Sequence, residues 1–269
     1  MVSRRVCPVL VGLFVASREM ASLRVGVAVV TVLCAMALQI LSNLINDYYD
    51  FRRGADKDGR AGYARALAEG EVSERQMIVA SCVAGGVAVA LGVYLVLVGG
   101  WPILLIGLTS LLFAWLYTAT DYSLAYLGIA DIFVFLYYGV IASMGTTYLQ
   151  TGAWSRTSFF AGAVRGLLSM CVLMANNLRD IEDDRPVGKR TFPVRFGKRA
   201  GEVAYILTVA LTPVMSFLAF GWNASMLVIV PGIYLIYSVL TAEGSQYNKC
   251  LLMAGVVNLV YVLLVVAFN

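Results

Sequence analysis

Residues 251–268 read LLMAGVVNLVYVLLVVAF, 18 positions without one charged side chain. An uninterrupted apolar run of this length suits a helix that crosses a bilayer, which needs about 20 residues. Similar runs recur along nearly the whole chain of 269 residues, of which 60% are hydrophobic and 13% charged. A typical soluble domain carries about 25% charged residues. The sequence therefore predicts an all-α, polytopic membrane protein that forms a single domain over residues 1–269.

The breaks between the apolar runs predict nine membrane-spanning helices. The first run is shorter than the roughly 17 residues that a straight span needs, so we expect an incomplete first helix or a truncated N-terminus. The predicted spans are residues 5–17, 25–47, 77–99, 101–119, 126–150, 157–177, 201–221, 224–241 and 250–268.

Lysine and arginine residues predict the orientation of the chain. With a cytoplasmic N-terminus, 16 of the 20 basic residues fall on the cytoplasmic side, mostly within 52–75 and 179–199. Such a bias is typical of cytoplasmic loops, so we expect both loops to face the cytoplasm. Trp101, Trp154 and Trp222 then fall at turns on the opposite side, as in an interfacial aromatic belt. In a membrane protein the location of the basic residues matters more than the net charge of +4. The expected partner is therefore membrane lipid, with no nucleic acid.

The residue types that are missing limit the possible chemistry. The chain contains no histidine, which excludes His-ligated zinc and nucleophiles activated by histidine. The five cysteines form no CxxC pair and lie in or beside apolar segments, so we interpret them as small buried residues. Any reaction has to use carboxylates, amides, hydroxyls and basic side chains.

The end of the second predicted span carries an acidic cluster. Asn43, Asp47 and Asp50 are spaced i, i+4, i+7, which places an amide and two carboxylates on one helix face, with Asn46 beside them. The segment that follows adds, in order, Arg52, Arg53, Gly54 and Asp56.

The end of the sixth predicted span repeats this arrangement. Asn176, Asp180 and Asp184 are spaced i, i+4, i+8, so one face is again acidic, and Lys189 and Arg190 follow. Both clusters are expected on the same side of the membrane.

Carboxylates at the edge of a membrane bundle are costly unless they are paired, bind a cation or line a substrate path. Two acidic faces that meet would surround one point with oxygen donors, which suits Mg²⁺ bound together with substrate phosphates. The basic residues after each cluster would bind phosphate oxygens. The alternative is that these charges only set topology, and the repeated pattern favours the magnesium-diphosphate site. Asp131 is a further acid at membrane depth, for which a capping contact and a functional role both stay open.

The same residues resemble two known signature motifs. Asn46-Asp47-x-x-Asp50-x-x-x-Gly54-x-Asp56 and Asp180-x-x-x-Asp184-x-x-x-Gly188-Lys189-Arg190-Thr191 are similar to those of the intramembrane aromatic prenyltransferases, the UbiA-like superfamily. Within it, the likeness is to the bacterial 1,4-dihydroxy-2-naphthoate polyprenyltransferases of menaquinone synthesis. Supporting runs are residues 43–54, 126–152 and 176–197, and the likeness extends from about Cys7 onward.

The resemblance implies nine helices around a central cavity in the bacterial cytoplasmic (inner) membrane, with the active site facing the cytoplasm. It also implies Mg²⁺ as cofactor, a polyprenyl diphosphate as donor and 1,4-dihydroxy-2-naphthoate as acceptor, with loss of the ring carboxylate as CO₂ to give demethylmenaquinol. Carried over residue by residue, the implied metal ligands are Asn46, Asp47, Asp50, Asp56, Asp180 and Asp184, with Asp47, Asp50, Asp180 and Asp184 catalytic. The implied diphosphate-binding residues are Asn46, Arg52, Arg53, Lys189 and Arg190.

The chain departs from the family pattern in two places. Its N-terminus is short, and the turn after Tyr117 reads Thr118-Ala119-Thr120-Asp121-Tyr122 where the family tends to have a Gly-Gly-Pro-like sequence. These departures affect one cavity wall and the loop on the acceptor side.

Two other functions stay open. One is a prenyltransferase of the same superfamily with a hydroxybenzoate, homogentisate or chlorin acceptor, and the other is a carrier for a phosphorylated lipid. The clusters lie at helix ends rather than at the membrane midplane, which favours an enzyme. Candidates for cation–π stabilisation of an allylic cation are Tyr48, Tyr49, Tyr117 and Tyr148, although ordinary packing is the commoner role of tyrosine.

Overall fold

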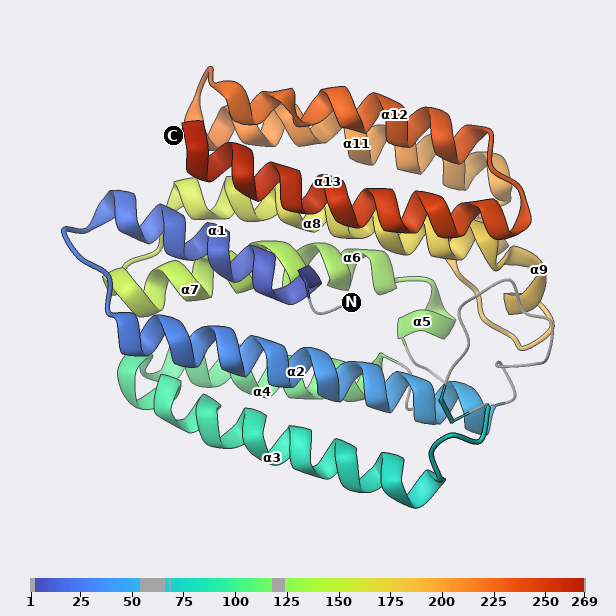
Figure 1. Cartoon of the computed structure of the whole chain (residues 1–269), viewed down its shortest axis with the longest axis horizontal. Coiled ribbons are helices and arrows are strands. Elements are labelled where there is room, and N and C mark those ends of the chain that lie inside the picture. Colours follow the sequence, from blue (N-terminus) through green and yellow to red (C-terminus); the bar gives the residue numbers. More distant parts are fainter. Residues whose placement is uncertain (1–2, 54–65, 68, 118–123, 269) are drawn as a thin grey trace.

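The computed structural model describes residues 3–53, 66–67, 69–117 and 124–268, and every regular element in these residues is a helix. The long helices run roughly along the longest axis of the molecule (Figure 1). In chain order the elements are α1 (Ser3–Glu19), α2 (Val25–Arg52), α3 (Glu74–Gly99), α4 (Trp101–Leu116), α5 (Leu124–Leu127), α6 (Ala130–Phe135), the π-helix η1 (Leu136–Val140), α7 (Ile141–Thr151), α8 (Arg156–Arg179), α9 (Ile181–Asp184), α10 (Phe192–Phe196), α11 (Lys198–Phe220), the 3-10 helix η2 (Ala224–Val228), α12 (Ile229–Leu240), the 3-10 helix η3 (Gly244–Gln246) and α13 (Tyr247–Phe268).

The described residues contain six helices that are long and apolar enough to cross a membrane. They are α2, α3, the continuous segment Ala130–Thr151, α8, α11 and the segment Gly244–Phe268. The segments Trp101–Leu116 and Ala224–Leu240 are shorter apolar helices, and α1 has 17 residues. The prediction of an all-α, multi-pass membrane protein is confirmed, whereas the count of nine spans stays a prediction, because the described residues contain six candidate spans.

Helix α8 forms the centre of the bundle. In its most apolar window 78% of the residues are buried, against 11% in the corresponding window of α3. It packs against α11 and α13 on one side and against α6, η1 and α7 on the other (Figure 1). Small residues allow the closest of these approaches, since a Cβ atom on Gly139 of η1 would lie only 2.5 Å from the carbonyl oxygen of Gly162.

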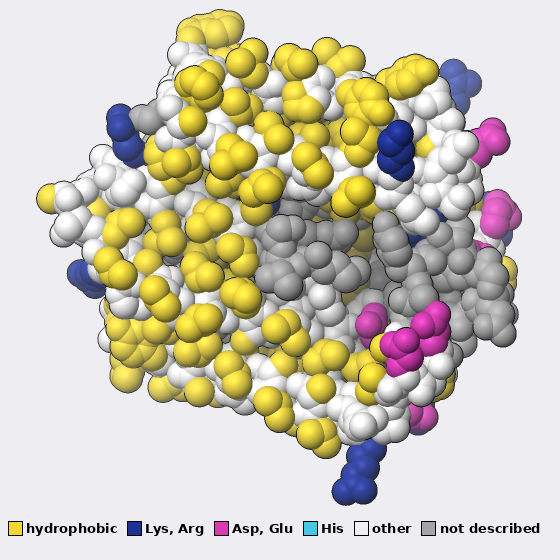
Figure 2. All heavy atoms as spheres, in the orientation of Figure 1, with side chains coloured by type: hydrophobic (Ala, Val, Ile, Leu, Met, Phe, Trp, Pro, Cys, Tyr) yellow, Lys and Arg dark blue, Asp and Glu magenta, His cyan; other side chains and the backbone are white. Residues whose placement is uncertain are grey.

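The outer surface of the bundle is apolar, as a lipid-facing surface has to be. Figure 2 shows hydrophobic side chains spread over the visible face, while the acidic side chains gather toward one end of the molecule. Large apolar side chains are exposed on the outer helices, for example Leu97 at 81%. Trp101, Trp154 and Trp222 are also exposed and lie at or beside the turns at the opposite end of the bundle, and their place in an aromatic belt stays a prediction.

Both acidic segments lie at the same end of the bundle. The C-terminal ends of α2 and α8 lie there, together with α5, α9 and the start of α3 (Figure 1). Local capping fixes α3 at this end, because Ser73 and Gln76 form a capping box. The fold thereby confirms that the two clusters emerge on one side, and it leaves a polar cavity between them.

Candidate active site

A polar cavity of about 210 Å³ lies between the ends of α2, α6, α8 and α9. Helix α2 contributes Gln39, Asn43, Asn46 and Asp50 to its wall. These positions are spaced i, i+4, i+7, i+11 and therefore share one helix face. Hydrogen bonds order the face, since Gln39 Nε2 donates to Asn43 Oδ1 at 2.9 Å and Asn46 Nδ2 donates to Asp50 Oδ2 at 3.2 Å.

The facing wall comes from α8, α9 and the segment that follows them. Asn176, Asn177 and Asp184 line the cavity, and so does Lys189. The helix does not continue straight through the second cluster, because α8 ends at Arg179 and Asp180 leaves the helical conformation before α9 begins. Asn176 and Asp180 still share a face, since Asn176 Nδ2 donates to Asp180 Oδ2 at 3.3 Å. Of the two acids in the expected stripe, Asp184 lines the cavity and Asp180 does not.

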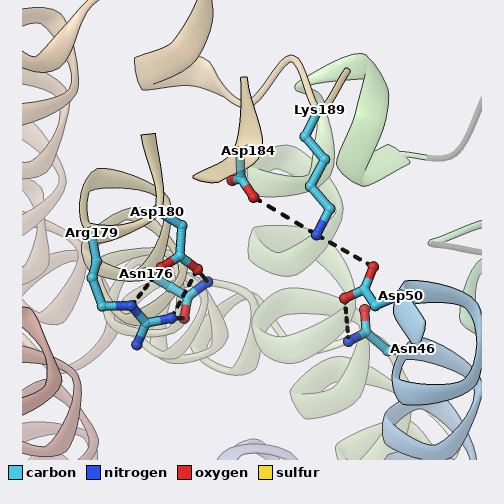
Figure 3. A network of polar contacts seen from close by, with 7 residues as sticks. All are labelled: Asn46, Asp50, Asn176, Arg179, Asp180, Asp184 and Lys189. Atoms are coloured by element: carbon cyan, nitrogen blue, oxygen red, sulfur yellow. Dashed lines mark hydrogen bonds and ion pairs between the residues drawn. The ribbon is translucent and has the colours of Figure 1, made fainter. Parts of the chain in front are cut away.

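Lys189 joins the two acidic segments. Its Nζ lies 3.3 Å from Asp50 Oδ1 and 3.8 Å from Asp184 Oδ1 (Figure 3). All three side chains are at least nine-tenths buried. The ammonium group thus lies between two carboxylates and reduces their repulsion in a poorly hydrated site.

Asp180 belongs to a neighbouring cluster outside the cavity wall. Its carboxylate accepts two hydrogen bonds from Arg179, from Nε at 2.6 Å and from Nη2 at 2.8 Å. Arg179 also donates to Asn176 Oδ1 at 2.8 Å (Figure 3). A further hydrogen bond runs from Arg179 Nη1 to Asn248 Oδ1 at 2.6 Å. Asn176 takes part in this cluster and also lines the cavity, so the cluster supports the cavity wall from behind.

The other predicted site residues lie elsewhere. Asp47 is half-buried and is not part of the cavity wall. Arg52 is exposed and forms an ion pair with Glu74 at 3.3 Å, and Arg53 and Arg190 also lie outside the wall. Asp56 lies outside the described residues. The roles predicted for these side chains stay predictions.

A close backbone contact holds the third wall in place. Gly128 has φ +73° and packs directly against the carbonyl of Arg190, where a Cβ atom would collide. Arg195 Nη1 donates to the carbonyl oxygen of Leu127 at 3.0 Å. These contacts fix the start of α6 against the segment after α9, and they bring Asp131 and Thr191 into the same cavity as Lys189.

The residues of this cavity fit a magnesium ion that is bound together with a substrate. Within the described part of the chain, no three acidic or cysteine side chains are grouped closely enough to hold a metal by themselves. Mg²⁺ keeps several waters and is usually held by one or two carboxylates plus substrate phosphates. Asp50 and Asp184 could supply the carboxylates, with the amide oxygens of Asn46 and Asn176 nearby.

A second, apolar cavity of about 330 Å³ adjoins the polar one. The two share Ser42, Tyr117, Val134 and Tyr138 in their walls. Of the aromatic candidates, only Tyr117 lies at this junction. The other three candidates make ring contacts elsewhere: Tyr48 and Tyr49 pack edge to face against each other, and Tyr148 stacks on Trp154. Tyr138 and Gln39 are among the wall residues that were not predicted. Tyr138 had no signal beyond its position in an apolar helix, while Gln39 stands one turn before Asn43 and could have been found.

Comparison with known protein families matches residues 6–266 to the UbiA prenyltransferase family. The chain belongs to this family. The match covers nearly the whole bundle, and it agrees with the two motifs that meet across the polar cavity.

Several relatives carry the same name, 1,4-dihydroxy-2-naphthoate octaprenyltransferase. The protein of Escherichia coli (strain K12) is 36% identical over 179 residues, which cover 64% of this chain and 58% of that protein. The protein of Haemophilus influenzae is 32% identical over 72% of this chain and 65% of its own length. The protein of Mycobacterium leprae is 34% identical over 76% of this chain and 70% of its own length. This chain therefore aligns with less than two thirds of the first two relatives.

Solved structures share the fold. A UbiA homolog from Aeropyrum pernix K1 superposes with a TM-score of 0.70 at 15% identity, covering 97% of this chain and 94% of that one. A UbiA homolog from Archaeoglobus fulgidus, bound to DMAPP and Mg²⁺, gives a TM-score of 0.66 at 16% identity. The superposition covers 99% of this chain and 96% of that one. At such identities the likeness concerns the arrangement of the helices.

Proposed function

We propose that this protein transfers a polyprenyl group from a polyprenyl diphosphate to 1,4-dihydroxy-2-naphthoate, with loss of the ring carboxylate as CO₂ to give demethylmenaquinol. The observation that carries this proposal is that the two cavities adjoin. A polar chamber with paired carboxylates and a buried ammonium shares four wall residues with an apolar chamber. A polyprenyl diphosphate has the same division into a charged head and an apolar tail, and relatives named for this reaction are up to 36% identical to the chain.

The polar chamber would bind the diphosphate. Lys189 supplies a charge-assisted donor for diphosphate oxygens, and Asn46 and Asn176 supply amide donors. Asp50 and Asp184 would hold Mg²⁺ through their carboxylate oxygens. When bound, Mg²⁺ stabilises the negative charge that develops on the leaving diphosphate. Charge stabilisation at the leaving group lets the allylic C–O bond break without a covalent enzyme intermediate.

The apolar chamber would bind the prenyl tail. Leu38, Leu95 and Phe113 are among its lining residues, and its wall is almost entirely hydrophobic. Such a chamber keeps water away from the allylic carbon, so that the ring carbon of the acceptor attacks it rather than water. Tyr117 and Tyr138 stand where the two chambers meet, which is where an allylic cation would form.

The proposal includes a topology of nine spans in the bacterial inner membrane, with the polar cavity facing the cytoplasm. The basic loops and the position of both acidic segments at one end of the bundle support it. Nine spans with a cytoplasmic N-terminus place the C-terminus in the periplasm. A C-terminal alkaline phosphatase fusion should therefore be active, while a fusion after Arg190 should be inactive.

The reaction is tested by incubating membranes that contain the protein with dihydroxynaphthoate and prenyl diphosphates of several lengths, and by identifying the products by mass. The expected product lacks the mass of the carboxylate, and EDTA should abolish its formation. Replacement of Asp50 or Asp184 by Asn should lower transfer by at least tenfold, since both would hold the metal. Asp47→Ala and Asp180→Ala test the two predicted ligands that lie outside the cavity wall.

Parallel assays with hydroxybenzoate, homogentisate and a chlorin test the other acceptors. Product from one of these alone would replace the naphthoate assignment and keep the transfer reaction. Transport of a phosphorylated lipid across proteoliposomes without any product would instead favour the carrier.

A further inference from the structure

Asp131 is a buried carboxylate whose role the diphosphate site does not explain. It lies in the first turn of α6, is 8% exposed and lines the polar cavity. Its Oδ1 atom is buried and accepts no hydrogen bond from any residue that the structure describes. A buried carboxylate oxygen without a donor is unfavourable at membrane depth. Its position in the cavity wall makes a ligand the natural source of that donor.

Asp131 differs from the other acids of the site in how it is neutralised. Asp50 and Asp184 share the ammonium of Lys189, and Asp180 is bound by Arg179. No ion pair joins Asp131 to a basic side chain among the described residues. Asp131 therefore does not belong to the ion-paired residues that would bind the metal and the diphosphate.

The helix that carries Asp131 connects it to the apolar cavity. One face of this segment lines the polar cavity with Asp131, Val134 and Tyr138, which are spaced i, i+3, i+7. Val134 and Tyr138 also line the apolar cavity. Asp131 thus lies on a separate wall from Asp50 of α2 and Asp184 of α9. A molecule bound to this wall would lie beside the junction of the two cavities, where the allylic carbon of the prenyl donor would be.

The chemistry of the two substrates decides which of them Asp131 can bind. A diphosphate offers oxygen acceptors and negative charge, so an unpaired carboxylate would repel it. A dihydroxynaphthoate carries two ring hydroxyl groups, and each is a hydrogen-bond donor that a carboxylate can accept. We propose that Asp131 binds a ring hydroxyl of the aromatic acceptor and exchanges its proton during transfer. This inference rests on the proposed function.

The proton and the electrons balance in this step. Asp131 takes the hydroxyl proton, and the ring carbon that bears the carboxylate forms a bond to the allylic carbon. The allylic C–O bond breaks and its electron pair leaves with the diphosphate, while the ring oxygen becomes a ketone. The bond to the carboxylate then breaks, CO₂ leaves, and its electron pair restores the aromatic ring. The ring oxygen recovers the proton from Asp131, which returns to its starting state.

The test compares Asp131→Asn with the wild-type protein, purified in lipid nanodiscs with saturating Mg²⁺. General acid–base groups contribute about 10²- to 10⁴-fold to rate, so kcat should fall by at least about 100-fold. The KM for the prenyl diphosphate and the Mg²⁺ concentration for half-maximal rate should stay within about twofold. Asp131→Glu should recover part of the rate, because it retains a carboxylate. The matched control is Asp183→Asn, which removes an exposed acid outside the cavity and should retain full activity.

Chemical rescue separates proton exchange from a structural role. Asp131→Gly leaves space in the cavity wall, and added formate should raise its transfer rate at least tenfold in a saturable manner. Formate should not raise the rate of the wild-type protein. The other titratable side chains that face this cavity are Asp50, Asp184, Lys189, Tyr117 and Tyr138, and they are unchanged in all these variants.

Three results would overturn the proposal. One is an Asp131→Asn variant that retains kcat and the KM for the acceptor within threefold. Another is a kcat that recovers when Mg²⁺ is raised, which would make Asp131 a metal ligand. The third is a folded Asp131→Gly variant that formate does not rescue while Asp131→Glu remains inactive. A wild-type protein that makes no prenylated naphthol would instead contradict the proposed function, and the variants would then be compared on whichever hydroxylated acceptor it uses.

Discussion

Lys189 Nζ lies 3.3 Å from Asp50 Oδ1, and this ion pair joins two segments of the chain that are far apart in sequence. Both side chains are almost fully buried, and Asp184 is the second acid on the same ammonium. The contact closes the polar cavity between α2 and the segment after α9. It also occupies the space between the two acids that the proposed metal would need, so substrate and metal binding should rearrange it.

Lys189→Met should destabilise the protein and weaken transfer. It leaves two buried carboxylates without their cation, and loss of one partner of a buried pair costs about 3–5 kcal/mol. Mg²⁺ should then raise the melting temperature more in the variant than in the wild type, since the metal replaces the lost charge. Transfer should fall at least tenfold. Thermal unfolding in detergent with and without Mg²⁺ measures the change in stability.

The control is Lys198→Met, which removes a half-exposed lysine paired with Glu202 at 3.9 Å. It should change stability by less than about 1 kcal/mol.

Arg179 and Asp180 should behave as one structural unit. Their two hydrogen bonds of 2.6 and 2.8 Å are buried, so Arg179→Gln and Asp180→Asn should each lower the free energy of unfolding by about 3–5 kcal/mol. The double variant should lose less than the sum, which a double-mutant cycle would report as coupling. The exposed pair Glu182–Arg185, at 4.0 Å, should show almost no coupling. Full recovery of Asp180→Asn activity at high Mg²⁺ would show instead that Asp180 is a metal ligand.

Gly139→Ala should disturb the contact between η1 and α8. The new Cβ would meet the backbone of Gly166 and the carbonyl oxygen of Gly162, neither of which can rotate away. We expect a loss of about 1–3 kcal/mol in unfolding free energy, and reduced transfer because α6 carries Asp131 into the cavity. Gly86→Ala on α3 meets nothing within 4 Å and should be neutral or slightly stabilising, since alanine favours helix more than glycine does. Equal melting temperatures for the two variants would contradict this packing.

Ala142→Phe should narrow the apolar cavity that Ala142 lines. If the prenyl tail occupies this cavity, transfer from long polyprenyl diphosphates should fall at least tenfold more than transfer from geranyl diphosphate. Competition between the two donors, read by product mass, gives the ratio directly. Ala90→Phe adds the same ring on the exposed face of α3, outside the cavity, and should leave the ratio unchanged. An unchanged ratio in Ala142→Phe would place the tail elsewhere.

The sequence predicted the membrane class and the existence of a site because both depend on local composition. A run such as residues 251–268 has to be buried in lipid or protein wherever the rest of the chain lies. The acidic segments were recognisable for the same reason, since carboxylates at membrane depth need a partner. The length of each helix was predicted less well, because α2 continues to Arg52, five residues beyond the expected end of the span.

The tertiary structure decided which side chains reach the cavity. The sequence predicted a face of α2 that contains Asn43, Asp47 and Asp50, whereas the observed face contains Asn46 in place of Asp47. Asn46 and Asp47 are successive residues, so they point about 100° apart around the helix. Only the position of the neighbouring helices selects Asn46, while Asp180 lies outside the cavity wall and is bound by Arg179 and Asn176. The sequence marked Asp131 as a buried acid, but its opening into the same cavity as Lys189 depends on how Gly128 packs against Arg190. Local patterns thus determine what a segment needs to bury or to bind, whereas the helix packing determines which groups meet, because side-chain contacts extend only a few ångströms.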